Sequence, residues 1–187
     1  MTTKILPFLL LFIIGCAPQQ VRTSIGVGGD LNLLSDNVQG GDGGISRSMS
    51  HGSFLVGWEV FSSHPTFIDI ATGISTLSHL TNDPGSPGYG PEVSIRVRYQ
   101  HIEEVEFFFE ITSAWMYFAE RWDPQSTNDG FVISAGPGIA IKAIENSWVT
   151  IGIRVTHESN GSKIFGRPEE NPGFNADMLY LGWEYRF

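Results

Sequence analysis

The sequence predicts an all-β protein: an eight-stranded antiparallel up-and-down transmembrane β-barrel with an interior filled by side chains. Apolar and polar residues alternate with a period of two in eight segments, as expected for strands with one apolar face. The connections between these segments are alternately long and short, which is the loop pattern of outer-membrane barrels with both termini in the periplasm. The composition also favours sheet, with 22 Gly, 13 Phe, 5 Trp and 5 Tyr and only 17% charged residues.

The expected strands are the alternating segments, and turn residues such as Gly, Pro, Asn and Asp mark their ends. The strands cover roughly residues 22–34, 52–62, 66–78, 92–101, 104–118, 130–143, 147–158 and 175–187. The long connections are residues 35–51, the surroundings of 82–88 and of 123–125, and residues 159–174. The short connections are at 63–65, 102–103 and 146.

The charged faces of these strands are expected to point into the barrel. An Arg or Lys that faces lipid at the membrane centre costs about 2–4 kcal/mol, so lipid accepts only the apolar faces. Because eight strands leave an interior that side chains just fill, we expect a plugged polar core rather than a pore. The residues expected to pair in this core are Glu59, Asp69, Glu106, Glu110 and Glu184 with Arg96, Arg98, Arg154 and Arg186.

The N-terminal residues resemble the export signal of a bacterial lipoprotein. Lys4 precedes an apolar run at residues 5–14, about half of the roughly twenty residues that a membrane-spanning helix needs. The run ends in a sequence similar to a lipobox, in which the signal is cleaved before a cysteine that is then acylated. We therefore expect residues 1–15 to be a signal peptide, Cys16 the lipidation site and residues 16–187 one outer-membrane barrel domain. An ordinary secretory signal is the alternative.

The last strand ends in an alternating run with a terminal aromatic residue, Tyr180-Leu181-Gly182-Trp183-Glu184-Tyr185-Arg186-Phe187. This run resembles the C-terminal signal by which the outer-membrane assembly machinery recognises barrel substrates. The machinery is therefore an expected partner, and the bacterial outer membrane the expected location. A soluble β-sandwich could end in the same way, but its apolar rows would then be prone to aggregation. A net charge of −9 with 11 basic residues gives no basic surface for nucleic acid.

A polar segment at the end of the seventh expected strand carries the candidate chemistry. By strand parity, His157 and Ser159 continue the outward apolar row of that strand at its extracellular end. A base beside a serine on one strand face is the minimum constellation for acyl transfer, and the ester available at that depth is a lipid. The alternative is a polar strand end and turn without catalysis. The other histidines, His51, His64, His79 and His101, lack the spacing of metal ligands.

Residues 149–187 carry a more specific pattern. His157-x-Ser159-Asn160 ends the penultimate strand, Asn171-x-Gly173 follows in a loop, and the last strand ends in Tyr-Arg-Phe. This pattern resembles the lipid A deacylase (PagL) family. The resemblance implies an eight-stranded outer-membrane barrel with a Ser-His-Glu triad on its outer surface. Such an enzyme hydrolyses the acyl ester at the 3-position of lipid A in lipopolysaccharide and needs no metal or cofactor.

The resemblance also implies roles for individual residues. Ser159 is the nucleophile and His157 the general base, while Asn160, Asn171 and Gly173 contribute to the oxyanion-stabilising and substrate-binding site. Where the family carries its glutamate, this chain has Asn175, so the triad acid is unassigned. The candidates are Asn175 itself, whose carbonyl oxygen can hold an imidazole, and Asp177 on the same strand face. Glu169 and Glu170 in the loop are weaker candidates.

The sequence also fits a second function class, namely a non-catalytic barrel that acts as an adhesin or stabilises the membrane. Its long loops would then bind partners. The loops at 35–51 and around 82–88 are rich in Gly, Ser and Pro, with few of the aromatic residues that anchor protein interfaces. Their composition therefore favours flexible loops over a docking surface.

Overall fold

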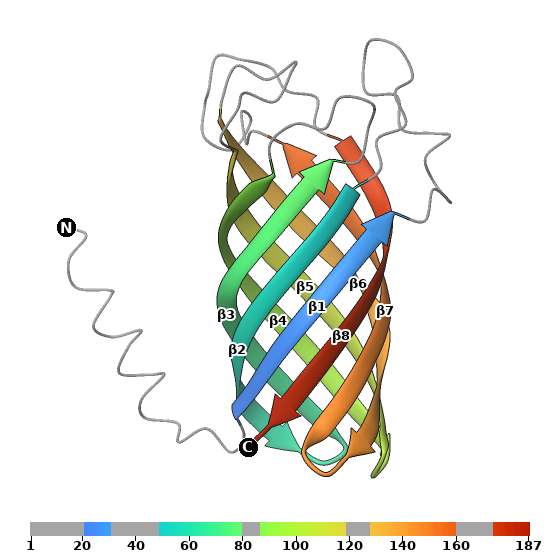
Figure 1. Cartoon of the computed structure of the whole chain (residues 1–187). Coiled ribbons are helices and arrows are strands. Elements are labelled where there is room, and N and C mark those ends of the chain that lie inside the picture. The colour runs from blue at the N-terminus through green and yellow to red at the C-terminus, as the bar shows by residue number, and fades with distance from the viewer. Residues whose placement is uncertain (1–20, 31–48, 80–86, 119–127, 160–173) are drawn as a thin grey trace, which may run out of the picture.

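The computed structural model describes residues 21–30, 49–79, 87–118, 128–159 and 174–187, which form one closed β-barrel with tilted strands (Figure 1). The strands are β1 (Val21–Asp30), β2 (Met49–Ser63), β3 (Thr66–His79), β4 (Gly88–Ile102), β5 (Val105–Phe118), β6 (Asp129–Ile144), β7 (Ser147–Ser159) and β8 (Phe174–Arg186). Neighbours in this order pair antiparallel, and β1 pairs with β8 to close the barrel. The predicted fold class is thus confirmed. Within the described residues, no helix is long and apolar enough to cross a membrane.

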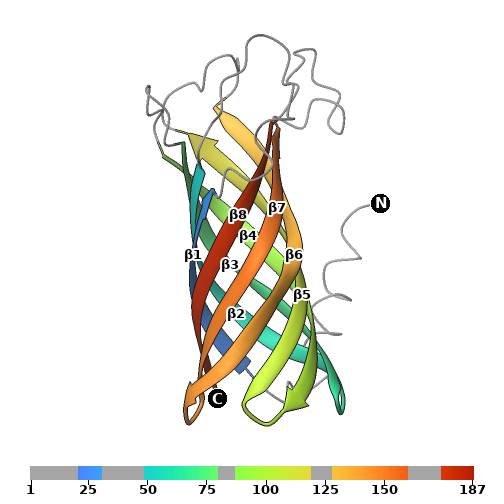
Figure 2. The same cartoon turned by 90° about the vertical axis from the view of Figure 1, so that its right-hand side faces the viewer.

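Three tight connections lie at one end of the barrel, together with the C-terminus (Figure 2). They are residues 64–65, 103–104 and 145–146, close to the predicted short connections. Asn146 in the last of them has a φ of 62°, a left-handed conformation that Asn adopts more readily than most residues. We call the opposite end of the barrel, where β7 ends and β8 begins, the outer end. The predicted long connections fall largely outside the described residues.

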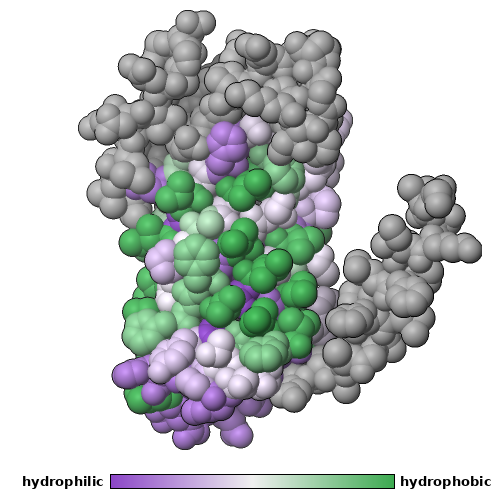
Figure 3. All heavy atoms as spheres, turned by 180° about the vertical axis from the view of Figure 1, so that it is seen from behind, coloured by the Kyte–Doolittle hydropathy of each residue, from purple (hydrophilic) through white to green (hydrophobic). Residues whose placement is uncertain are grey.

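Side chains alternate between the outside and the interior along most of each strand, with register shifts between Glu59 and Phe61, Gln100 and Ile102, and Lys142 and Ile144. On β4, for example, Val93 and Ile95 are 49% and 50% exposed, whereas Ser94 and Arg96 between them are 1% exposed. Figure 3 shows the resulting surface from one side: apolar side chains cover the middle of the barrel and polar ones gather at the end with the tight turns. A belt of this extent is stable only when lipid covers it. The alternation predicted from the sequence therefore reflects a membrane outside and a polar core inside.

The nine charged residues predicted to pair inside form one connected network. Arg98 donates hydrogen bonds to Asp69 (2.7 Å), Glu59 (2.8 Å) and Glu106 (3.0 Å). Arg186 bonds Glu106 and Glu184, Arg96 bonds Glu184 and Glu110, and Arg154 also bonds Glu110. Every member is buried. Because each guanidinium lies against at least one carboxylate, the charges compensate one another in an environment without bulk water.

Each arginine of the network also lies over an aromatic ring. The four pairs are Arg96 over Phe108, Arg98 over Phe67, Arg154 over Tyr180 and Arg186 over Trp148, with 3.8–5.0 Å from the guanidinium carbon to the ring centroid. Such stacking favours a planar guanidinium over a lysine ammonium. Tyr180 in turn packs on Gly26 of β1, where a Cβ atom would overlap its ring. The polar core is therefore packed as well as charge-compensated.

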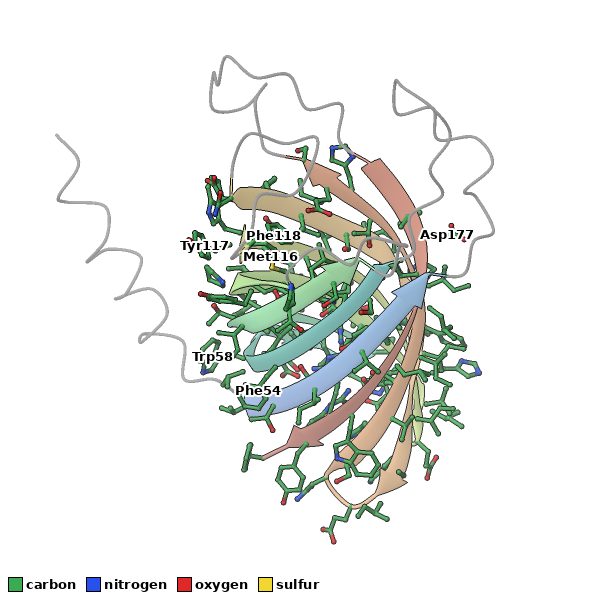
Figure 4. The ribbon with its side chains drawn as sticks, turned by 45° about the horizontal axis from the view of Figure 1, so that its top comes forward. Phe54, Trp58, Met116, Tyr117, Phe118 and Asp177 are labelled. Carbon is green, nitrogen blue, oxygen red and sulfur yellow. The ribbon has the colours of Figure 1, made fainter. Side chains whose placement is uncertain are left out.

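An apolar collar closes the interior towards the outer end, and the sequence did not predict it. Its members are Leu77, Ala114, Met116, Phe118, Val132, Ala176 and Met178, all buried. Figure 4 shows Met116 and Phe118 on the inner side of the barrel wall. Hydroxyl groups below the collar contact two of its sulfur atoms, Ser75 with Met116 at 3.9 Å and Thr156 with Met178 at 3.3 Å. The interior is thus filled at both levels, in agreement with a plugged barrel.

Candidate functional site

The candidate residues come together where β6, β7 and β8 reach the outer end. His157 lies between Ile133 of β6 and Asn175 of β8 in the two registers. Ser159 lies opposite Phe131 of β6. Directly opposite residues of an antiparallel pair have Cβ atoms about 4.5–5.5 Å apart. The backbone therefore fixes which side chains surround the histidine and the serine.

The outward orientation expected for His157 and Ser159 is confirmed. Val155, the preceding member of the outward row, is 52% exposed, His157 is exposed and Ser159 is half-buried. The residues between them point inward, since Thr156 and Glu158 are buried. The β7–β8 pairing continues without a bulge from Ser147 to Glu158, so parity is maintained along the strand. Both candidate side chains thus project from the barrel wall at the end of an apolar row.

Glu158 stands between the two candidates in the sequence but not in space. Its side chain is fully buried on the inner face, beside the apolar collar. Neighbouring residues on a strand point to opposite sides of the sheet. The Glu158 carboxylate therefore lies on the opposite face of β7 from the side chains of His157 and Ser159.

Asp177 is the carboxylate of β8 on the outward side of the sheet (Figure 4). It lies opposite Val155, one pair further along than the His157–Asn175 pair, and is thus a diagonal neighbour of the histidine. Diagonal neighbours are about 7–8 Å apart, and somewhat less between their Cβ atoms, which is within the reach of aromatic and long side chains. Asp177 is only 3% exposed, although Leu181 further along the same row is 46% exposed. A carboxylate this well shielded from solvent is a suitable partner for an imidazole.

Asn175 lies directly opposite His157, closer in register than Asp177. The backbone therefore places both predicted alternatives for the third member beside the histidine. The remaining predicted residues lie outside the described part of the chain: the signal peptide, Cys16, Asn160, Glu169, Glu170, Asn171 and Gly173.

Two aromatic residues that the sequence did not place at the site lie beside the serine. Phe131 is directly opposite Ser159, and Trp115 of β5 is directly opposite Phe131. The centroids of the two rings are 6.4 Å apart. The strand alternation predicted that both residues face outward, but their position beside Ser159 follows only from the β5–β6–β7 register.

Three of the histidines that lack metal-ligand spacing lie at different places in the barrel. His51 is buried in the interior, where its Nε2 lies 3.1 Å from Glu92 Oε2, while His64 and His101 are exposed at the end with the tight turns. Among the described residues, no group of three or more His, Cys, Asp or Glu side chains is arranged to hold a metal ion.

No protein-family model matches the chain, and no curated protein matches it in sequence. Solved structures do match its fold. The N-terminal β-barrel domain of OprF from Pseudomonas aeruginosa aligns with a TM-score of 0.54 at 10% identity, covering 91% of this chain and 98% of that one. The outer membrane enzyme PagL gives 0.54 at 14% identity, with 87% and 97% covered. Outer membrane protein H (OprH) from P. aeruginosa gives 0.54 at 12% identity, with 89% and 99% covered.

The chain has the fold of the bacterial outer-membrane β-barrels. This fold, together with the apolar belt around the barrel, indicates a location in the bacterial outer membrane, as the sequence predicted. In such barrels the tight turns face the periplasm, so the outer end and the candidate site face the extracellular side. The fold is common to an enzyme and to barrels whose names state no activity, and at these identities it does not assign a function.

Proposed function

We propose that this barrel is an outer-membrane serine esterase that removes the ester-linked acyl chain at the 3-position of lipid A. The observation that carries the proposal is the outward projection of His157 and Ser159 at the extracellular end of the apolar β7 row. At this depth the adjoining molecules are the lipids of the outer leaflet. A base and a hydroxyl on one strand face can transfer an acyl group from such a lipid.

The chemistry follows from these two groups. The Ser159 Oγ attacks the ester carbonyl while the His157 imidazole takes up its proton. The tetrahedral intermediate collapses, the imidazolium returns the proton to the departing sugar 3-oxygen, and the acyl group stays on the serine. Water, deprotonated by His157, then attacks the acyl-serine, and the released serine oxygen regains the proton as the fatty acid leaves. No metal or cofactor enters any of these steps.

Asp177 is the group we assign to orient the imidazole. It is a shielded carboxylate on the outward side of β8 and a diagonal neighbour of His157, whereas Glu158 points inward. Asn175 is the alternative, since its amide oxygen can accept the imidazole N–H but stabilises an imidazolium less than a carboxylate does. The family resemblance assigns Asn160, Asn171 and Gly173 to stabilisation of the oxyanion.

Two further proposals concern the route of the protein to its membrane. Recognition by the assembly machinery is assigned to the last strand, whose outward row ends in the exposed Trp183, Tyr185 and Phe187. The lipobox-like sequence assigns acylation to Cys16. Mass measurement of the mature N-terminal peptide tests the latter, because a diacylglyceryl cysteine differs in mass from a free one.

Mass spectrometry of lipid A tests the esterase proposal. The full chain is expressed in a lipopolysaccharide-producing bacterium that has no 3-O-deacylase, and lipid A is compared between wild type, Ser159→Ala and Ser78→Ala. Ser78 is the matched control, a half-buried serine near the outer end of β3 that lies away from β7. Wild type and Ser78→Ala are expected to release one 3-O-linked hydroxyacyl chain, and Ser159→Ala none. Unaltered lipid A in all three strains, with folded barrel in the membrane, would refute the proposal. The protein would then be a non-catalytic barrel.

A further inference from the structure

Two outward aromatic pairs lie near the outer end of the barrel. Phe131 and Trp115 face each other across β6 and β5, with ring centroids 6.4 Å apart. Tyr89 and Tyr117 face each other across β4 and β5, with ring centroids 6.0 Å apart. Aromatic residues at this level are usual in outer-membrane barrels, where they lie at the membrane–water interface. The two pairs differ, however, in their relation to the candidate site.

Only one pair adjoins the serine. Phe131 is the direct register partner of Ser159, and Trp115 continues the same row on β5. Tyr117 belongs to the next pair along, opposite Asp129, so its row does not include Ser159. Phe131 and Trp115 are half-buried, whereas Tyr89 and Tyr117 are 57% and 48% exposed. An acyl group attached to the Ser159 oxygen would therefore begin within contact distance of the Phe131 ring.

The two sides of Ser159 also differ in chemistry. Towards β8, the nearest described outward positions are His157 on the same strand, its register partner Asn175 and, one pair further along, Asp177, and all three are polar residues. On the β6 side they are Phe131, Trp115 and Ile133, all apolar. The ester of a lipid has the same asymmetry, with a polar sugar on its alkoxy side and a hydrocarbon chain on its carbonyl side. One orientation of the ester matches both sides at once.

We infer that the Phe131–Trp115 pair binds the hydrocarbon chain of the ester being cleaved and determines which acyl chains are accepted. This inference rests on the proposed esterase function and adds the specificity-determining residues of its site. The polar headgroup then lies over the β8 side of Ser159. The Tyr89–Tyr117 pair serves only the membrane interface.

The rings act by packing rather than by removing the chain from water. An acyl chain in the outer leaflet is already in an apolar medium, so its transfer to an aromatic surface brings no hydrophobic gain. Close contacts with two rings instead restrict the orientation of the chain and hold the carbonyl carbon near the nucleophile. Because the first few methylenes make these contacts, the effect grows with chain length and then levels off.

The test is a chain-length profile of hydrolysis by the purified full-length protein in detergent micelles. The probes are glucosamine derivatives with a 3-O-acyl chain of increasing length, from acetyl to palmitoyl. The variants are Phe131→Ala, Phe131→Leu and Trp115→Ala, with Tyr117→Ala as the matched control from the other pair. Phe131→Leu keeps an apolar side chain and supplies a folded variant if the alanine substitution impairs folding.

We expect Phe131→Ala to lower kcat/KM about tenfold for the long chains and far less for the acetyl ester, whose single methyl group makes few of these contacts. Phe131→Leu and Trp115→Ala are expected to give smaller losses with the same dependence on chain length, and Tyr117→Ala none. An active wild type whose chain-length profile is unchanged in Phe131→Ala and Phe131→Leu would overturn this inference alone. An equal loss in Tyr117→Ala would also overturn it, because both pairs would then act as general interface anchors. A folded wild type that cleaves none of the esters would overturn the esterase proposal and this inference with it.

Discussion

Two groups of polar side chains in this barrel lie in different environments, the charged network of the interior and the pair His157 and Ser159 at the outer end of the β7 surface. In the interior, four arginines and five carboxylates compensate one another, and every arginine also covers an aromatic ring. These residues are accounted for by the fold alone. On the surface, His157 and Ser159 end a row that is otherwise apolar.

The interior charges stabilise the barrel, whereas His157 and Ser159 are displayed on its outer surface. Removing an interior charge leaves its partners without compensation, so stability depends on it. Removing a surface hydroxyl at the end of β7 leaves every charge of the interior network with its partners. We therefore expect substitutions of the interior charges to lower the stability, and substitutions of the surface pair to lower the activity.

Substitution of the surface pair is expected to have the largest effect on activity. Ser159→Ala and His157→Ala should each lower kcat by at least about a thousandfold, because nucleophile and base act as a unit. Their free energies of unfolding should change by less than about 0.5 kcal/mol, as expected for substitutions away from the core. Ester hydrolysis and urea unfolding in lipid vesicles measure the two quantities. A large loss of stability in either variant would contradict the claim that the surface pair does not stabilise the barrel.

Substitution of an interior arginine is expected to have the opposite profile. Arg98→Met should cost about 3–5 kcal/mol of unfolding free energy, because it leaves Glu59, Asp69 and Glu106 without their common partner. Lys142→Met is the control. Lys142 lies 3.7 Å from Glu103, but the two side chains are 30% and 78% exposed, so the pair should contribute less than about 1 kcal/mol. Equal losses in the two variants would show that burial of the network is unimportant.

Charge on the apolar belt tests the outer surface in the same way. Ile153→Arg places a cation on the lipid face of β7 and should cost about 2–4 kcal/mol of unfolding free energy if the site lies near mid-membrane. Ile144→Arg, at the turn end of β6 where the side chain is 65% exposed, should cost no more than about 1 kcal/mol. The unfolding free energies are compared in the same vesicles. Tolerance of Ile153→Arg would contradict the assignment of this face to lipid.

Substitution of the residue that orients the imidazole, Asp177 or Asn175, should have a smaller effect on activity. Asp177→Asn is expected to lower kcat about a hundredfold and Asn175→Ala less, since a carboxylate stabilises the imidazolium better than an amide does. Steady-state kinetics on a soluble short-chain ester measures both variants. If Asn175→Ala is the more damaging of the two, the orienting role belongs to the asparagine.

Sequence alone predicted the barrel and its charged core because lipid and lumen impose a period of two on every strand. In β4, Arg96 and Arg98 fall on the face opposite Val97, and that parity places them inside without any knowledge of register. The apolar collar escaped because its β5 residues, Met116 and Phe118, alternate with the outward Trp115 and Tyr117. Both faces of β5 are apolar there, so the sequence has no polar–apolar alternation that would show which residues face the interior.

For the candidate site, the sequence predicted only the features that depend on a single strand. The outward orientation of His157 and Ser159 follows from parity within β7, and it is confirmed. The neighbours of the pair, among them Phe131 and Asp177, depend on how β6 and β8 are registered against β7. Register is set by cooperative pairing around a closed barrel, and a single sequence does not specify it.

Active-site labelling tests the central claim most directly. The purified barrel is treated with an alkyl fluorophosphonate, which phosphonylates an activated serine with loss of fluoride, and the modified residue is located by peptide mass spectrometry. The account predicts one adduct on Ser159 in wild type and none in His157→Ala. A folded wild-type barrel that stays unlabelled, or that is labelled equally well without the histidine, would contradict an activated serine at the outer end of β7.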